Sequence, residues 1–599
     1  MPRLRLVTAA AAISALTVAA PTLAAGKPHR HADAMGWLSV AHPAGARAQI
    51  VDAAGRTVLL RGVNVAGIED DVYAHAAGHA PGPAPLWPAD PASYDGICPA
   101  NSHAGAEPPV CEVDAGKPEF EQSAAPDSHN DLAQIRALGF NVIRLTVSWS
   151  LLEPTAGHYN TAYVDRIAQV VEWAREQRVY VLLDMHQDAY SRYTPETAPA
   201  SAPPLVEPTY EGGDHADGAP PWAVVTDGEP ALAAAGQGEL NAYVAAAFTN
   251  FWLNRVPAGA AQGQAPGPGL QDHYIGAVAA LAKRFLNDPT VVGYELMNEP
   301  LPGYLPPPVF DTGYLFPFYR RVVDAVTGVS DGAICPAGMP YAAACGYADL
   351  RVHDRRHLFF VEPMAARNLI DIAPGVSAPF TTYPNVVYAP HLYTHVFTAE
   401  TQLPDDGGGV YPPSYDFGLQ TADAEARAIG AALWVGEYGN SNGADATVLA
   451  AETAAQDRAL VGSALWQWKA NCGSGPCDMA GLWAVYAADT APAPAQNGAL
   501  FASRQRYVDR VYPLATTGAL QSFGYDPTAR SFAMSATSDQ KVPRGARDRE
   551  TVVYLPAAVT PVVRVSGAAV LDGVLTQADG SRLAYVAPTG AGAYAITLA

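Results

Sequence analysis

The sequence has little charge, and little of that charge is positive. Only 16% of its 599 residues are charged, and 36 Lys and Arg stand against 58 Asp and Glu, for a net charge of −22. Proteins that bind nucleic acid or an anionic membrane surface carry clustered basic residues. Neither partner is expected here, and we interpret the acidity as serving solubility.

Long hydrophobic runs are also scarce, and only the N-terminus has one. Arg3 and Arg5 precede an apolar, Ala-rich stretch over residues 6–20, followed by small residues to position 25. This order is typical of a secretory signal peptide, so residues 1–25 are predicted to direct secretion, to the periplasm or outside the cell. A membrane anchor is the alternative, which the Ala-rich composition disfavours. Residues 26–36 are expected to form a disordered leader.

Cysteine is rare, with six in the chain. Disulfide bonds between these cysteines would agree with export. Of the 15 possible connectivities, we favour the one that pairs cysteines close in sequence. A zinc site is the alternative, but these cysteines have no CxxC spacing. We therefore expect disulfides, no metal and no organic cofactor. The expected pairs are Cys98 with Cys111, Cys335 with Cys345, and Cys472 with Cys477.

Strand-length apolar runs alternate with helical spacing over most of the chain. This alternation predicts a (β/α)8 TIM barrel over residues 37–515, with its chemistry at the carboxyl ends of the strands. Two stretches rich in Gly, Pro and Ala, 71–126 and 194–238, are expected to be long loop insertions. The eight predicted strands are LLRGVNV, NVIRLTV, YVLLDMH, VVGYELMNE, LFFVEP, VVYAPHLY, LWVGEYG and SALWQWK.

The chain changes character near its C-terminus. Residues 516–599 contain short alternating runs such as TVVYLP and AYAITLA, with Gly and Asp turns and no helical period. This pattern predicts a small β-sandwich. A structural role is expected for it, with sugar or lipid binding as the alternative.

Two of the predicted strands end in glutamate. VVGYELMNEP places Asn298 and Glu299 at its carboxyl end, and LWVGEYG places Glu437 at its own. A carboxylic acid can give its proton to a leaving oxygen while a neighbouring amide holds a substrate hydroxyl, which is half of the chemistry of glycoside hydrolysis. That chemistry needs a second carboxylate, and a barrel would bring the two strand ends together.

The motifs NVIRL, DMHQD, MNEP, APHLY, VGEYG and WQWK together resemble glycoside hydrolase family five. Within the family, DMHQDAYS and the two insertions look most like the endoglycoceramidases. The resemblance implies that Glu299 is the acid/base, Glu437 is the nucleophile and the anomeric configuration is retained. Retention requires carboxyls about 5 Å apart. The charge of the nucleophile is expected to raise the pKa of the acid.

Other side chains are expected to support the nucleophile. Arg144 lies within an apolar strand, where an unpaired guanidinium would be costly, so we expect it to pair with Glu437; a structural ion pair is the alternative. His391 and Tyr393 alternate along a predicted strand and face one side. The resemblance places the histidine near the acid/base and the tyrosine hydroxyl on the nucleophile.

The remaining candidates are substrate contacts. His186 and Asp188 follow a strand and are expected to bind sugar hydroxyls. Trp466 and Trp468 share a face of the last predicted strand, and the pattern favours Trp468 as the platform under the sugar. Asn64, at the end of the first barrel strand, is a further expected contact, as is Asn298.

An apolar segment follows the acid/base directly. The run LPGYLPPPVFDTGYLFPF, residues 301–318, is hypothesised to form a ceramide groove, with packing on the barrel as the alternative. The predicted function is hydrolysis of the bond between glycan and ceramide in glycosphingolipids, by a monomer with transient contact with micelles or membranes. The alternatives are a β-glucanase or β-glucosidase acting on soluble glycans, and an inactive glycolipid-binding protein.

Overall fold

The structure is a computed structural model. It describes residues 35–65, 131–191, 218–228, 242–257, 268–330, 349–380, 382–398, 414–440, 445–470, 484–488, 497–500, 502–559 and 562–598. The predicted signal peptide, the whole of insertion 71–126, most of insertion 194–238 and all six cysteines lie outside these ranges. The predicted export and disulfides therefore stay predictions.

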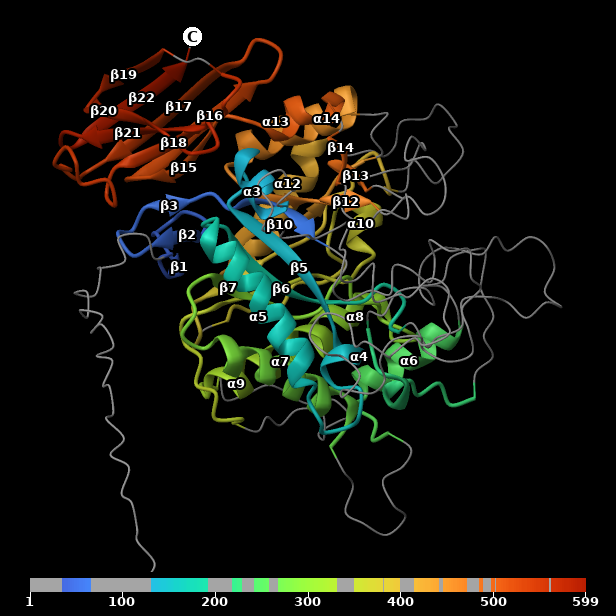
Figure 1. Cartoon of the computed structure of the whole chain (residues 1–599). Helices are drawn as coiled ribbons and strands as arrows, with labels where there is room; N and C mark the ends of the chain where they lie inside the picture. Colours follow the sequence, from blue (N-terminus) through green and yellow to red (C-terminus); the bar gives the residue numbers. More distant parts are fainter. Residues whose placement is uncertain are drawn as a thin grey trace, which may run out of the picture. The chain divides into compact units, whose positions relative to one another are not determined.

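Eight parallel strands close into a barrel (Figure 1), in the order β10-β11-β4-β5-β6-β7-β8-β9. Each predicted barrel strand overlaps one of them, which confirms the predicted architecture. Five of the eight strands are shorter than their apolar runs suggested, and several functional side chains follow the strand that delivers them. The bounds are β4 (Arg61–Val65), β5 (Val142–Ser148), β6 (Tyr180–His186), β7 (Val291–Glu295), β8 (Leu358–Val361), β9 (Val386–Tyr388), β10 (Ala432–Tyr438) and β11 (Gly462–Leu465).

One glycine shows how closely these strands pack. Gly293 lies in β7, and a Cβ atom built there would be 2.1 Å from the carbonyl oxygen of Leu358 in β8. No side chain fits at that distance, so a residue without one is required. β7, which leads to the acid/base, is thereby held against its neighbour.

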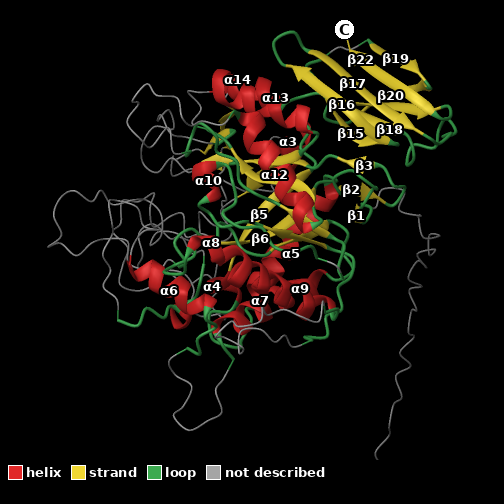
Figure 2. Cartoon of the chain, turned by 180° about the vertical axis from the view of Figure 1, so that it is seen from behind, coloured by secondary structure: helices red, strands yellow, loops and turns green. Residues whose placement is uncertain are grey.

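Helices accompany the barrel strands (Figure 2) and begin and end at recognisable residues. α12, for example, follows Ser414, whose hydroxyl accepts the N–H of Phe417, and it ends at Gly430, which has a φ of 69°. Among the described helices, none is both long and apolar enough to cross a lipid bilayer. The longer ones are α5 (Thr161–Glu176), α6 (Ala242–Trp252), α7 (Leu270–Phe285), α9 (Phe316–Thr327), α12 (Tyr415–Ile429) and α13 (Ala450–Ala459).

The C-terminal strands form a four-stranded and a seven-stranded sheet, which agrees with the predicted β-rich domain. The four-stranded sheet contains β16 (Ala519–Asp526), β17 (Ser531–Ser538), β22 (Gly592–Leu598) and β19 (Val563–Gly567). The larger sheet has the order β1-β2-β3-β15-β18-β21-β20, so it also includes three strands from the start of the described chain. Its C-terminal strands include β18 (Thr551–Leu555), β20 (Ala569–Thr576) and β21 (Arg582–Pro588). The first three, β1 (Leu38–Ala41), β2 (Gln49–Asp52) and β3 (Thr57–Val58), were expected within the barrel domain. They join the C-terminal strands because β3 pairs with β15 (Tyr512–Thr516).

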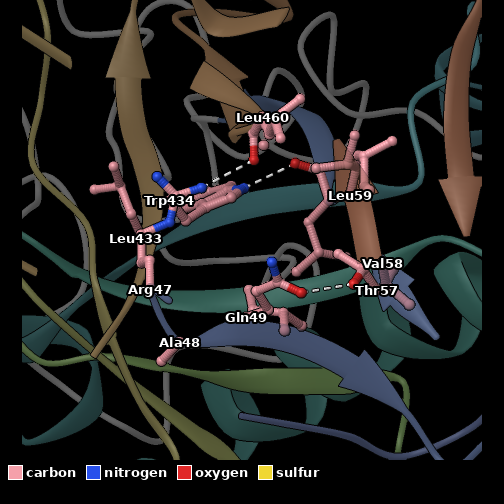
Figure 3. A pocket seen from close by; sticks show the side chains of 13 residues that line it. Arg47, Ala48, Gln49, Thr57, Val58, Leu59, Leu433, Trp434 and Leu460 are labelled. Carbon is pink, nitrogen blue, oxygen red and sulfur yellow. Dashed lines mark hydrogen bonds between the residues drawn. The ribbon is translucent and has the colours of Figure 1, made fainter. Parts of the chain in front are cut away.

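A small cavity lies at the amino-terminal end of the barrel (Figure 3). Leu433 and Trp434, near the start of β10, line it together with Gln49 and Thr57 of the hairpin β2–β3, and the indole N–H of Trp434 donates to the carbonyl of Leu60 at 2.8 Å. TIM-barrel chemistry occurs at the opposite, carboxyl ends of the strands. This cavity is therefore not the candidate active site.

From Phe310 on, most large side chains of the apolar run after Glu299 belong to the core. The run forms α8 (Pro307–Phe310), a π-helical turn at Asp311–Leu315 and the start of α9. Phe310 and Phe316 are at most 1% exposed, and Phe310 packs edge-on against Trp252 with ring centroids 4.9 Å apart. The hypothesis of a groove built from these aromatic rings is therefore wrong. Phe310 and Phe316 are buried in the packing of the helices instead. Val309, 49% exposed, is an apolar side chain of this run that does face solvent.

Candidate active site

Two glutamates lie together at the carboxyl ends of the barrel strands. Glu299 follows β7 and Glu437 lies in β10, and they are 437 − 299 = 138 residues apart. A carboxylate oxygen of Glu299, one of Glu437 and a ring nitrogen of His391 all lie within 4.8 Å of one another. The fold thus brings together the carboxylates that the sequence nominated as a pair.

Arg144 in β5 organises the floor of the site. Its guanidinium is fully buried and donates to Oε1 of Glu437 at 2.6 Å, to Oε2 of Glu295 at 2.5 Å, and lies 3.1 Å from Oδ2 of Asp184. Burial alone would lower the pKa of Arg144, but the charges of these acids raise it well above its ordinary value. The predicted Arg144–Glu437 pair is present, and Arg144 is a permanent cation beside Glu437, the predicted nucleophile.

Tyr393 holds the second oxygen of the nucleophile. Its hydroxyl donates to Oε2 of Glu437 at 2.7 Å. β9 ends at Tyr388, so His391 and Tyr393 do not lie on the predicted strand; a single β-bridge from Leu392 to Tyr438 carries this segment past β10 instead. Arg144 and Tyr393 together occupy both oxygens of Glu437 and fix its orientation.

Glu299 is the more open carboxylate, with a side chain that is 27% exposed. Its Oε1 accepts from the amide of Asn368 at 2.6 Å and lies 2.7 Å from Nδ1 of His391. Burial acts to raise the pKa of Glu299, but the hydrogen bond and charge of His391 outweigh it, and the pKa is lowered. The prediction of a raised pKa is therefore wrong for this state, because it left out the histidine.

His391 carries the positive charge next to both glutamates. It is fully buried; Nδ1 faces Glu299, and Nε2 lies 3.3 Å from Oε1 of Glu362. Burial favours the neutral ring, yet the surrounding carboxylates raise the pKa of His391 well above its ordinary value. Gly436 leaves room for this ring, since a Cβ there would meet two of its atoms at 3.0 Å. The site therefore holds an imidazolium in contact with the acid/base.

The structure gives different outcomes for Asn64 and Asn298, the two asparagines predicted to contact substrate. Asn64 is fully buried: its amide donates to the carbonyls of Gly436 and Ala464, and its Oδ1 accepts from Arg144 at 2.9 Å. It positions Arg144 and has no atom left for a sugar, so the prediction of a substrate contact is wrong. Asn298 accepts from Arg144 at 2.8 Å and donates to the carbonyl of Gln187, and its second amide hydrogen leaves the prediction open.

His186 and Asp188 lie together at the end of β6. Nδ1 of His186 is 2.7 Å from Asp184, and Nε2 is 3.6 Å from Asp188. Burial would lower the pKa of His186, but the two aspartates raise it to about 10. Asp188 is 32% exposed and His186 only 5%. Asp188 is thus the member of the pair that can reach a ligand, and His186 supports it.

The predicted sugar platform is wrong. Trp468 is 1% exposed and its indole N–H donates to Asp131 at 3.0 Å, which makes it a core residue. Trp466 is partly exposed and stacks on His186, with ring centroids 5.5 Å apart and planes 8° from parallel. β11 ends at Leu465, so the alternation that favoured Trp468 does not extend past the strand. Trp466 is the aromatic face available at this site.

Several residues that contact Glu299 were not predicted from the sequence. Gln187 donates to the carbonyls of Asn298 and Glu299 at 2.7 and 3.2 Å, and thereby clamps the main chain of the acid/base. Glu362 directly follows β8 in the run LFFVEP. It is a glutamate at a strand end, as Glu437 is, and this pattern could have identified it. Asn368 lies in α10 (Arg367–Ile370), where no sequence pattern distinguishes it.

Comparison with known families agrees with this geometry. Residues 113–472 match the family described as cellulase (glycosyl hydrolase family 5), and residues 510–593 match the glycoside hydrolase family 5 C-terminal domain. The first match covers more than half of the chain. The chain belongs to glycosyl hydrolase family 5, and it is a glycoside hydrolase.

The relatives narrow the resemblance further. Endoglycoceramidase I of Rhodococcus hoagii is 27% identical over 470 residues, which cover 76% of this chain and 77% of that protein. The crystal structure of an endogalactoceramidase is 25% identical, with a TM-score of 0.63 over 94% of this chain and 100% of that one. Endo-glycoceramidase II from Rhodococcus sp., solved with ganglioside GM3, is 23% identical with a TM-score of 0.59 over 92% and 99%, and it shows the shared fold.

Proposed function

We propose that the protein is a secreted, retaining β-glycosidase that hydrolyses the bond between glycan and ceramide in glycosphingolipids. The observation that carries the reaction type is the approach of Glu299 and Glu437, whose nearest oxygens lie within 4.8 Å. Retaining glycosidases hold their two carboxyls about 5–5.5 Å apart, whereas inverting enzymes leave about 6.5–9.5 Å for a water molecule. So short an approach favours direct attack by a carboxylate on the sugar.

The contacts of the two glutamates assign their roles. Glu437 accepts hydrogen bonds from Arg144 and Tyr393 on its two oxygens, which aims it as the nucleophile. Glu299, reached by solvent and hydrogen-bonded to His391, donates the proton to the leaving oxygen as the bond to Glu437 forms. Glu299 then takes a proton from the water that hydrolyses the glycosyl-enzyme ester. The anomeric configuration is retained because it is inverted twice.

An apolar surface beside the acid/base supports a lipid aglycone. Asn368 contacts Glu299, and Leu369 and Ile370, the next two residues of α10, are 47% and 38% exposed. Asp311 accepts the main-chain N–H groups of Met364 and Gly375, which ties this segment to the one that carries the exposed Val309. Exposed apolar side chains thus adjoin Asn368, a residue in contact with the proposed acid/base. The names of the relatives, endoglycoceramidase and endogalactoceramidase, point to the same aglycone.

A β-glucanase or β-glucosidase acting on soluble glycans is the second candidate, because the matched family is described as a cellulase. An inactive glycolipid-binding protein is disfavoured, since Glu299, Glu437, Arg144 and Tyr393 form an intact set of contacts.

The decisive experiment is product analysis by mass spectrometry. Purified protein is incubated with a panel of glycosphingolipids and with a soluble β-glucan, each with and without detergent. Release of intact oligosaccharide together with free ceramide is expected. Cleavage of the glucan alone would transfer the function to the second candidate, and no cleavage of any β-glycoside would overturn both.

The role of the apolar surface has its own test. The double variant Leu369→Ser, Ile370→Ser is expected to lose about tenfold in turnover of a glycolipid and to keep its rate on a water-soluble aryl glycoside, because about 1.5–3 kcal/mol is typical of burying such side chains. Val562→Ser, at a 58% exposed valine of the C-terminal domain, is the matched control. Equal losses on both substrates would overturn a lipid-binding role.

Two further measurements address the nucleophile and export. A fluorinated glycosyl donor should trap a covalent sugar on Glu437, seen by peptide mass spectrometry; label on another residue would refute the assignment. N-terminal sequencing of the protein recovered from the medium or periplasm of a producing cell should start near residue 25. Recovery of the full-length chain in the cytoplasm would contradict secretion.

A further inference from the structure

Glu362 lies on the far side of His391 from the acid/base. Nδ1 of the buried imidazole is 2.7 Å from Oε1 of Glu299, and Nε2 is 3.3 Å from Oε1 of Glu362. Glu362 is 2% exposed, whereas the side chain of Glu299 is 27% exposed. A buried carboxyl group and a solvent-accessible one are therefore linked through the two nitrogens of one ring.

Glu362 also contacts the main chain of the acid/base. Its Oε2 accepts the N–H of Glu299 at 3.3 Å. Glu299 has a φ of 39°, in the left-handed region, which a non-glycine residue adopts only where its surroundings hold it. The contact with Glu362 helps to hold this conformation. Glu362 thus acts on Glu299 both through the imidazole and through the peptide N–H.

His391 lies slightly closer to the carboxylate of Glu362 than Arg144 does. Burial raises the pKa of Glu362, although His391 and Arg144 act to lower it, and burial raises the pKa of neighbouring Glu295 strongly. Arg144 is 3.5 Å from Glu362 and donates a shorter hydrogen bond to Glu437. The titratable and charged groups that face Glu362 and His391 are Arg144, Asp184, His186, Tyr274, Glu295, Glu299, Tyr319, Tyr393 and Glu437.

We propose that Glu362 is a positioning residue whose carboxylate holds the catalytic proton on His391, which exchanges it with Glu299. This inference rests on the retaining reaction proposed above. Glu299 is ionised while the site is empty, and the proton resides on the buried ring of His391, beside Glu362. Substrate that covers Glu299 removes its solvent and draws the proton outward.

The relay balances over one turnover. Nδ1 of the His391 imidazolium gives its proton to Glu299, which protonates the leaving oxygen as the C–O bond breaks and Glu437 forms the ester. His391 is then neutral and keeps its proton on Nε2, beside the carboxylate of Glu362. In the second step Glu299 accepts a proton from the attacking water and returns it to Nδ1. The water's remaining O–H becomes the hydroxyl on the sugar, and the enzyme is restored.

The relay should matter only where protonation of the leaving group matters. A lipid alcohol is a poor leaving group and needs a proton, whereas a dinitrophenolate leaves without one. Glu362→Gln keeps an oxygen to accept the N–H of Glu299 but removes the charge that holds the proton on His391. The charge of Glu362 raises the pKa of His391, so its removal lowers that pKa and the catalytic proton is lost at lower pH.

The experiment compares wild type, Glu362→Gln and Glu362→Asp on a glycosphingolipid and on a dinitrophenyl β-glycoside across pH. For Glu362→Gln, we expect kcat/KM to fall about 10–100-fold on the glycolipid and less than about threefold on the aryl glycoside. The alkaline limb of its kcat/KM profile should move to lower pH. For Glu362→Asp, which keeps a carboxyl group, the limb should lie between those of the wild type and Glu362→Gln. Thermal unfolding establishes that each variant is folded.

The control is Asp509→Asn, at a partly buried carboxyl with a pKa raised by burial to about 7, near the start of β15 and apart from the contacts of both glutamates. Asp509→Asn should keep the wild-type ratio of kcat/KM on the glycolipid to kcat/KM on the aryl glycoside. Equal losses of Glu362→Gln on both substrates, or an alkaline limb that does not move in the folded variant, would overturn the relay. Failure of the wild type on every β-glycoside would instead overturn the proposed function.

Discussion

The hydroxyl of Tyr393 donates a 2.7 Å hydrogen bond to Oε2 of Glu437. The tyrosine is buried against the nucleophile, and burial together with the charge of Glu437 raises its pKa well above the ordinary value. It is therefore a neutral donor at every pH at which the enzyme could work. A hydrogen bond to a charged group contributes about 1.5–3 kcal/mol, so this contact can decide how Glu437 is aimed.

Tyr393→Phe removes only that donor. We expect kcat to fall about 10–100-fold with little change in KM, because the ring still fills its site while the nucleophile loses its orientation. Steady-state kinetics on an aryl glycoside measures both constants. An unchanged kcat would mean that Arg144 alone orients Glu437.

Arg144→Met should destabilise the fold as well as abolish activity. The guanidinium is the common partner of Glu437, Glu295 and Asp184, and removing one partner of a buried ionic group costs about 3–5 kcal/mol. Urea denaturation measures the change in the free energy of unfolding. Arg458→Met, at a 56% exposed arginine paired with Asp416, is the control and should cost about 1 kcal/mol at most. Similar losses for the two variants would contradict a central role for Arg144.

Asn368→Ala tests the second hydrogen bond on the acid/base. The amide donates to Oε1 of Glu299 at 2.6 Å and so favours the carboxylate. Its loss should raise the pKa of Glu299, and the alkaline limb of kcat/KM should move to higher pH by about one unit. This direction is opposite to that expected for Glu362→Gln. A shift to lower pH would show that Asn368 acts in some other way.

Gly436→Ala tests whether His391 needs the space beside β10. A Cβ at position 436 would lie 3.0 Å from Cδ2 and Nε2 of the imidazole, so the ring must move and the Glu299 contact must change. We expect about a tenfold loss of kcat/KM and about 1–3 kcal/mol of destabilisation, measured by kinetics and by thermal unfolding. Gly524→Ala, where a Cβ meets nothing within 4 Å, is the control and should be nearly neutral. Full activity of Gly436→Ala would show that His391 tolerates displacement.

The barrel and the carboxylate pair could be predicted because both rest on local pattern. Buried parallel strands read as apolar runs, and a closed barrel brings their carboxyl ends to one place. Glu299 and Glu437 each stand at such an end, so their meeting followed from the fold class alone. Arg144 was recognisable for a similar reason, since a charge inside an apolar strand requires partners.

The features that sequence could not give depend on long-range contacts. His391 is 92 residues from Glu299 in sequence, and only the folded chain places its ring where it lowers the pKa of that carboxyl. Phe310 and Phe316 were candidates for a lipid groove because an aromatic-rich run reads alike whether it lines a groove or packs in a core. Trp468 was favoured by an alternation that ends with the strand at Leu465.

Trp466 and Trp468 allow that last error to be tested directly. Trp466 is partly exposed and stacked on His186, so Trp466→Ala should weaken substrate binding or turnover about tenfold and leave thermal stability nearly unchanged, since stacking on an aromatic face contributes about 0.5–1.5 kcal/mol. Trp468 is buried and donates to Asp131. Trp468→Ala should instead cost about 3–5 kcal/mol of folding free energy through the cavity that it leaves. Kinetics on a soluble aryl glycoside and denaturant unfolding separate the two effects. If Trp468→Ala kept its stability and lost substrate affinity while Trp466→Ala did not, the platform would be Trp468 after all, and the aromatic face beside His186 would be packing.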